Sequence, residues 1–181
     1  AGQVGRLRAL SPEQLAFSVL TASGSIESFR TSAAAKVEKE PPESLKNATP
    51  AALPVVRALV IETQTVHQAA GFLSTVAGLF ADPLASEFQS SVNQALWLGN
   101  SAELAGWLRP GGANLAARLA ALPDDGLLAI EAYLAIFSRY PDAEEKALVA
   151  AALAGRADDR PAAIAELLGA MLSSNEFRFN H

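Results

Sequence analysis

The stretch LLAIEAYLAIFSRYPDAEE, residues 127–145, constrains the fold more than any other part of the chain. Its first eleven residues contain a single charge, Glu131, so a helix there is apolar on nearly every face, a pattern typical of a helix buried on all sides. Pro141 cannot continue that helix, and Asp142, with a glutamate three residues later, forms the capping box of a new one. The stretch predicts a helical hairpin whose first arm, 127–138, is the buried central helix.

Alanine occupies 38 of the 181 positions, and half of all residues are hydrophobic. Alanine is the strongest helix former, and its small side chain lets helices pack closely. No stretch shows the alternation of apolar and polar residues that predicts strands. The expected fold class is therefore all-α, a compact bundle of about six to eight helices around the buried helix 127–138. We expect residues 1–181 to form a single helical domain.

The charge distribution excludes two classes of partner. Residues 1–50 carry six Lys and Arg against five acids, and residues 51–181 carry eight against fourteen, which leaves the second part near −6. Such a field repels phosphate groups, so we expect neither nucleic acid nor an acidic membrane surface as a partner. The longest apolar runs, about a dozen residues, are shorter than the roughly 20 needed to insert across a membrane, and no signal-peptide pattern opens the chain.

The chain has no cysteine and two histidines, His67 and His181. It can therefore form neither disulfides, thiolate metal sites nor a covalently attached c-type haem, and the histidines lack the H-x-x-x-H spacing of a zinc site. Asp124-Asp125 and Asp158-Asp159 each precede an expected helix, where capping explains them better than calcium binding. We expect no cofactor and no metal, and we find no hydrolase, P-loop or dinucleotide-binding motif.

Turn residues divide the chain into helical segments. Ser11 with Gln14 predicts a capping box at a helix start, and Gly24 predicts the end of that helix. Ser101 and Asn114 predict further helix starts. After Gly24, the stretch at about 28–47 is too poor in apolar residues to offset its ordering entropy, which predicts a mobile polar loop.

The segment from Ala51 to Phe80 predicts one long helix. Its apolar residues recur at helical spacing. They are Val56, Leu59, Val60, Val66, Ala70, Leu73, Val76 and Phe80. A helix of about thirty residues is far longer than the usual 11–12 or so, and we therefore expect a break near Gly71 or Gly78.

Four stretches resemble a known family in their order and spacing. They are LRALSPEQLAFSVLTASG (7–24), SVNQALWLGNSAEL (91–104), AYLAIFSRYPDAEE (132–145) and AIAELLGAMLSSNEFRFNH (163–181). They are similar to the C-terminal part of the planctomycete-type DUF1553 family, also called PSD1. The resemblance implies a domain of a larger exported bacterial protein, periplasmic or at the cell surface, which in this family often carries a DUF1549 domain. Residues 51–80 depart from the family pattern, and the family offers no catalytic residues to carry over.

Four residues are candidates for binding, namely Trp97, Trp107, Glu131 and His181. The two tryptophans flank a Gly-Asn-Ser turn and could stack on sugar rings, although their apolar neighbours favour core packing. Glu131 needs Arg139, Arg118 or a surface opening to stay ionised, and a structural ion pair is favoured over a catalytic glutamate because no second catalytic group is near. His181 could contact a neighbouring domain.

Residue chemistry alone does not identify a function, so two hypotheses stand. The leading one is a non-catalytic helical module that packs against a neighbouring domain of the same polypeptide or a protein partner. The alternative is an accessory part of an extracellular carbohydrate-active hydrolase whose site is completed by an upstream domain. A deep polar cleft at Glu131, His67 or His181 would favour the hydrolase, and a flat exposed apolar patch would favour the module.

Overall fold

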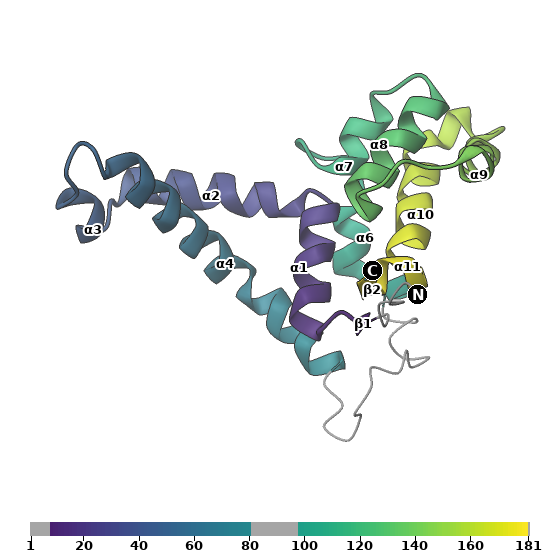
Figure 1. The fold of residues 1–181 in the computed structure, drawn as a ribbon. Helices are drawn as coiled ribbons and strands as arrows, with labels where there is room; N and C mark the ends of the chain where they lie inside the picture. Colours follow the sequence, from purple (N-terminus) through teal and green to yellow (C-terminus); the bar gives the residue numbers. More distant parts are fainter. Residues whose placement is uncertain (1–7, 81–97, 181) are drawn as a thin grey trace, which may run out of the picture.

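A computed structural model describes residues 8–80 and 98–180 of the chain, and in this part the protein is all-α apart from one pair of two-residue strands. Figure 1 shows a body of short helices and an arm that projects from it. In chain order the elements are β1 (Arg8–Ala9), α1 (Pro12–Ala22), α2 (Ser25–Lys39), α3 (Glu43–Lys46), α4 (Leu53–Phe80), α6 (Ala102–Trp107), α7 (Leu115–Ala120), α8 (Asp125–Phe137), α9 (Ala143–Leu153), the 3-10 helix η1 (Ala157–Asp159), α10 (Arg160–Leu172), α11 (Asn175–Arg178) and β2 (Phe179–Asn180). The described part thus holds more than the six to eight helices expected, partly because α3 and α11 are single turns.

Most helix starts coincide with the predicted caps. Capping boxes are present at Ser11 and at Asp142, where in each case the side chain accepts from the backbone N–H of the third helical residue. Ser101, Asn114 and Asp124 cap α6, α7 and α8 in the same way. The second aspartate pair differs from the prediction.

Asp158 and Asp159 lie in η1, and Asp159 also occupies the N-cap position of α10. Asp159 precedes α10 but makes no side-chain bond to its first turn, because it pairs with Arg156 at 2.9 Å instead. Arg156 also pairs with Glu166. Capping is therefore the wrong explanation for Asp159, which forms an ion pair.

The prediction of a polar loop at about 28–47 is wrong, because most of this stretch is helical. Helix α2 continues to Lys39, and α3 follows after a short turn. The helix is stabilised by contact with α4, against which Ala33 and Val37 are buried. Its polar face carries ion pairs to α4, one between Arg30 and Glu62 at 2.7 Å.

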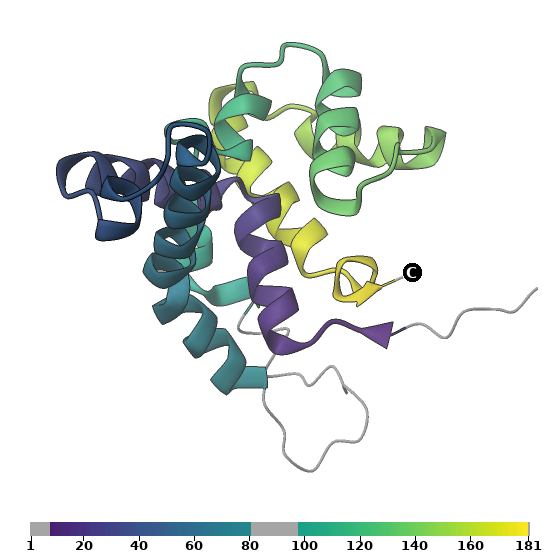
Figure 2. The same ribbon diagram turned by 60° about the vertical axis from the view of Figure 1, so that its left-hand side comes forward.

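Helix α4 is continuous over 28 residues, so the break expected near Gly71 or Gly78 is absent. Neither glycine lies close to a neighbouring segment, since a Cβ at either position would meet nothing within 4 Å. The C-terminal half of α4 packs on α1 and the base of α2, while its N-terminal half runs out with α2. We call α2, α3 and the part of α4 before Thr65 the arm (Figures 1 and 2).

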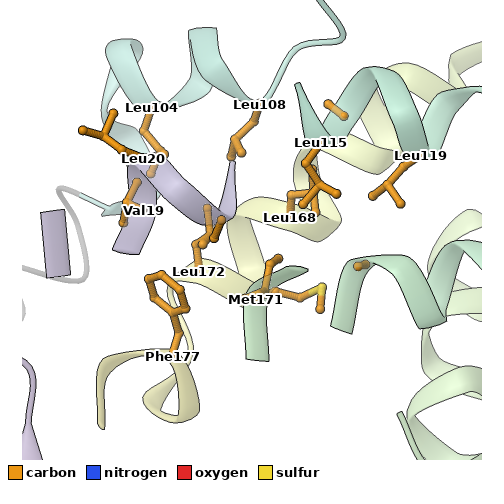
Figure 3. Close-up of a cluster of buried hydrophobic side chains, with 14 of the residues drawn as sticks. Val19, Leu20, Leu104, Leu108, Leu115, Leu119, Leu168, Met171, Leu172 and Phe177 are labelled. Carbon is orange, nitrogen blue, oxygen red and sulfur yellow. The ribbon is translucent and has the colours of Figure 1, made fainter. Parts of the chain in front are cut away.

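The body is centred on α10 rather than on the helix predicted from residues 127–138. Helix α10 contacts α7, α8, α9, α11 and η1, and Ile164 and Leu168 on it are fully buried. Figure 3 shows Leu168, Met171 and Leu172 of α10 meeting side chains of α1, α6 and α7. Helix α8 leaves Leu127 and Leu134 exposed, so it lies at the edge of the body with one buried face.

The two ends of the described chain meet beside α1. Strands β1 and β2 pair antiparallel, with Ala9 opposite Phe179, and the backbone N–H of Leu10 donates to the carbonyl of Arg178 at 3.0 Å. Phe177 is buried in the core cluster. The terminal turn is therefore part of the packed body.

Candidate functional site

Two of the four candidate residues, Trp97 and His181, lie outside the described residues. Trp107 lies where the arm joins the body. Its ring packs edge-on against Phe72 of α4 at 4.4 Å between centroids and against Phe29 of α2 at 6.5 Å. Both contacts are with aromatic side chains of neighbouring helices. They correspond to core packing, the alternative to sugar stacking in the sequence analysis.

Glu131 forms an ion pair at the surface of α8. Arg118 on α7 donates from Nε to its carboxylate at 3.1 Å, and both side chains are exposed. Of the partners expected for Glu131, the structure shows Arg118, and the pair is also in contact with solvent. A carboxylate held in this way does not provide the desolvated acid that a glycosidase needs.

The remaining titratable candidates are dispersed. His67 lies exposed on α4, remote in sequence from Asp124 and Asp125 at the start of α8. Asp125 pairs with Arg160 of α10 at 2.7 Å, which holds the start of α8 against the body. Among residues 8–80 and 98–180, no three His, Asp or Glu side chains converge as a metal-binding group.

The strongest electrostatic cluster joins the predicted hairpin to the chain end. Arg139, just after α8, donates to both oxygens of Glu145 at 2.6 and 2.8 Å and to both oxygens of Glu176 at 2.6 and 2.9 Å. Its guanidinium also lies 5.1 Å from the centroid of the Tyr133 ring. These hydrogen bonds lower the pKa of Glu145 to about 2 and raise that of Arg139. Both groups stay charged near neutral pH, so the cluster stabilises the fold and supplies no proton donor or acceptor.

A groove of about 830 Å³ separates α6 from α10 and η1. Its floor consists of small and apolar residues, among them Ala105, Leu108 and Gly169, and acidic residues of η1 and α10 lie at its edge. Of these, Glu166 binds Arg156, which lowers the pKa of its carboxyl group. The groove therefore combines apolar lining residues with a carboxylate, Glu166, that is held ionised by Arg156.

A row of exposed apolar side chains on α4 begins in the arm and continues just beyond it. Val55 and Leu59 are 62% and 63% exposed, Val66 is 44% exposed, and the small Ala70 extends the row. At 100° per residue these four positions fall within about 60° of the helix circumference, so they lie along one side of the helix, with Glu62 and Thr63 between Leu59 and Val66. We call Val55, Leu59, Val66 and Ala70 the α4 stripe.

The α4 stripe and the buried face of α4 are different faces of one helix. The buried face carries Thr65, Ala69, Phe72 and Val76, which contact α1 and α2. This face is centred about 100° around the helix from the stripe. Monomeric proteins seldom leave three large apolar side chains aligned in water, so such a stripe is typical of an interaction surface.

The sequence contained this surface without distinguishing it from the core. The apolar pattern from which the long helix was predicted includes Leu59, Val66, Ala70 and Val76 without separating them into two faces. The structure buries Val76 and exposes Leu59. The signal that separates the two faces is Thr65, which is buried among the apolar residues because its hydroxyl donates to the carbonyl of Ile61 at 2.8 Å.

No helix in the described part of the chain combines the length and apolarity needed to cross a bilayer. Comparisons with protein-family models, with curated proteins and with solved structures found no match for this chain. The resemblance to the DUF1553 family remains a prediction that rests on the residues quoted above.

Proposed function

We propose that the chain is a non-catalytic helical interaction module whose binding surface is the α4 stripe. The observation that carries this proposal is the exposure of Val55 and Leu59 on the projecting arm, in one row with Val66 just beyond it. A flat apolar patch is the feature expected of a module, whereas a hydrolase needs a polar cleft with convergent titratable groups. The resemblance to the DUF1553 family supports its placement in a larger exported bacterial protein, with the partner a neighbouring domain or another protein.

The described carboxylates do not favour the hydrolase alternative. A glycosidase needs one carboxylic acid whose pKa is raised and a second carboxylate at a fixed distance from it. The two carboxyl groups with the clearest ion pairs to arginine, Glu145 and Glu166, have lowered pKa values because those arginines donate hydrogen bonds to them. Glu131 pairs with Arg118 in contact with solvent.

The proposal is tested by thiol labelling, because the chain has no cysteine of its own. Leu59→Cys places a probe in the stripe, and Leu148→Cys places a matched one on α9, where the leucine is equally exposed at 63%. If the stripe docks on a partner, labelling at position 59 in the whole polypeptide with its partners is slower than in the isolated chain. Labelling at position 148 serves as the control for general accessibility. Equal rates at position 59 in both settings contradict the proposal.

A second measurement separates the module from the hydrolase. Glu131→Gln removes the charge that Arg118 binds while keeping the size of the side chain. We expect no loss of any glycosidase activity measured for the whole polypeptide, and at most about 1 kcal/mol of lost stability, since the ion pair is exposed. Loss of such an activity with the fold intact would replace the module by the hydrolase.

A further inference from the structure

The α4 stripe has a spacing that reads the same from both ends. Its residues are separated by four, seven and four positions, so the stripe is symmetric about the peptide bond between Glu62 and Thr63. In an antiparallel pair of identical helices, residues whose numbers add to 125 lie opposite each other. Val55 then meets Ala70 of the other helix, and Leu59 meets Val66. A two-fold interface requires this self-complementarity of one patch.

The centre of the stripe presents no unsatisfied polar group to a second helix. Glu62 is already bound by Arg30 of α2, whose Nε lies 2.7 Å from its carboxylate, and the same arginine also binds Glu27. The hydroxyl of Thr63 donates to the carbonyl of Leu59 at 2.8 Å. Both polar side chains at the symmetry point thus have partners before a second helix approaches, which reduces the desolvation penalty.

The charge of the arm also suits a second copy. Residues 25–64 carry five basic side chains, Arg30, Lys36, Lys39, Lys46 and Arg57, and five acidic ones, Glu27, Glu38, Glu40, Glu43 and Glu62. The arm is therefore neutral (5 − 5 = 0), while the chain as a whole carries −5. Two copies repel each other through the rest of the chain and least through their arms. Because the arm projects from the body (Figures 1 and 2), an antiparallel pairing keeps the two bodies at opposite ends of the paired helices.

We propose that the α4 stripe binds the α4 stripe of a second copy of this chain, antiparallel and with two-fold symmetry. This inference rests on the proposed function and names the partner of the same surface. The stripe has four residues, far fewer than the roughly 20–30 that each partner contributes to a standard stable interface. The dimer is therefore weak and concentration-dependent, and it forms where copies are held close together.

The first test is sedimentation velocity of the isolated chain from low micromolar to millimolar concentration. The wild-type chain shifts from monomer to dimer across this range. Leu59→Lys raises the dissociation constant roughly a hundredfold, because two buried leucines are lost per dimer. Leu148→Lys, which adds the same charge at an equally exposed leucine on α9, leaves the dissociation constant unchanged. A wild-type chain that stays monomeric throughout, or a dimer that tolerates Leu59→Lys, overturns the inference.

The second test fixes the orientation by oxidative or short-reagent cross-linking of single cysteines. Thr63→Cys lies next to the two-fold axis, so the cysteine at position 63 of one chain cross-links to the cysteine at position 63 of the second chain. Val55→Cys lies opposite Ala70 of the other copy, fifteen residues and about 22 Å along the helix from the other Val55, so it does not cross-link alone. The pair Val55→Cys and Ala70→Cys, mixed from two separate variants, does. Cross-linking by Val55→Cys alone indicates a parallel pair and overturns the inference.

The two proposals fail separately. If the chain is monomeric in sedimentation but its position 59 is protected from labelling in the whole polypeptide, self-association is wrong and the interaction module stands. If position 59 is equally accessible in both settings and the chain does not self-associate, both proposals are wrong.

Discussion

The arm and the body both consist of helices that contain alanine, but they differ in how many large apolar side chains they bury. In the body, Ile164 and Leu168 of α10 are fully buried, and α10 contacts α7, α8, α9 and α11. Figure 3 shows Leu168 within the apolar cluster. In the arm beyond its base, α2 buries only Ala33 and Val37 against α4. Burial of large alkyl groups contributes most of a helical fold's stability. The arm is therefore the less stable region, and it leaves large apolar residues of α4 exposed.

Ion pairs do not remove this difference. The arm has Arg30 with Glu27 and Glu62, and Arg57 with Glu38, but these side chains are exposed, and exposed pairs contribute little. In the body, Arg139 binds two carboxylates with two hydrogen bonds each and lies over an aromatic ring. The body thus combines a larger core with a better-formed ionic junction.

The largest expected effect comes from a cavity in the body. Leu168→Ala should lower the free energy of unfolding by about 2–5 kcal/mol, the range for a fully buried leucine. Val37→Ala in the arm should lower it by only about 1–2 kcal/mol, because the residue is smaller and its neighbours can close around it. Chemical denaturation measures the first value, and hydrogen exchange should show that Val37→Ala loosens α2 while the amides of α10 stay protected. Equal losses from the two substitutions would contradict a stability difference between the regions.

A smaller effect is expected at the junction of the two regions. Gly24 ends α1 and precedes α2 with φ of +75°, and the N–H of Leu115 donates to the carbonyl of Ser23 beside it. A Cβ at Gly24 would lie 3.1 Å from the backbone nitrogen of Leu115. Gly24→Ala therefore combines an unfavourable left-handed conformation with a backbone contact, and we expect a loss of about 2 kcal/mol.

The control for the junction is Gly155→Ala. Gly155 has φ of +72°, but a Cβ there would meet nothing within 4 Å. Its substitution should cost about 1 kcal/mol, from conformation alone. The difference between the two shifts in melting temperature isolates the effect of the close approach of α7 to Gly24. Equal shifts would mean that the junction has room to relax.

The sequence predicted the local features of the fold better than the placement of its helices. Caps such as Ser11 and Asp142 act over three residues, and both were predicted correctly. The stretch at 28–47 was assigned to a loop because its polar composition outweighed the spacing of Phe29, Ala33 and Val37, which becomes decisive only when α4 lies alongside. Whether a segment is helical there depends on a tertiary contact that composition does not contain.

The same limit applied to the candidate site. The apolar pattern of α4 covers more of its circumference than one neighbouring helix can bury, and the sequence does not say which part is left exposed. The helix 127–138 is a second example, since its apolar character predicted burial on all sides while Leu127 and Leu134 are exposed. Helices rich in apolar residues can be assigned from sequence, but which of their apolar residues stay exposed is defined only by the packed structure.

The smallest expected effect is the pH dependence of the ionic junction in the body. In the folded chain the Glu145 carboxylate accepts two hydrogen bonds from Arg139, which lowers its pKa from 4.5 to about 2. In the unfolded chain this hydrogen bonding is lost and the pKa returns to its ordinary value. Because the folded pKa is the lower one, the stabilisation is fully present above pH 4.5 or so and is lost as the pH falls from there to about 2. The arm also has an arginine between two carboxylates, Arg30 with Glu27 and Glu62, but those carboxylates are more exposed than Glu145.

Glu145→Gln tests this dependence with little change of shape. Glutamine can still accept the backbone N–H of Asp142, so the capping box is kept while the charge that Arg139 binds is removed. We expect a loss of about 1 kcal/mol at neutral pH, since the arginine is partly exposed, and a shallower fall in the free energy of unfolding between pH 4.5 and 2. Glu144→Gln removes a charge from the neighbouring exposed position of α9 and should leave that slope unchanged. If the Glu145→Gln and wild-type curves run parallel over this interval, the junction does not contribute to the greater stability of the body, and the leucine core of α10 alone accounts for it.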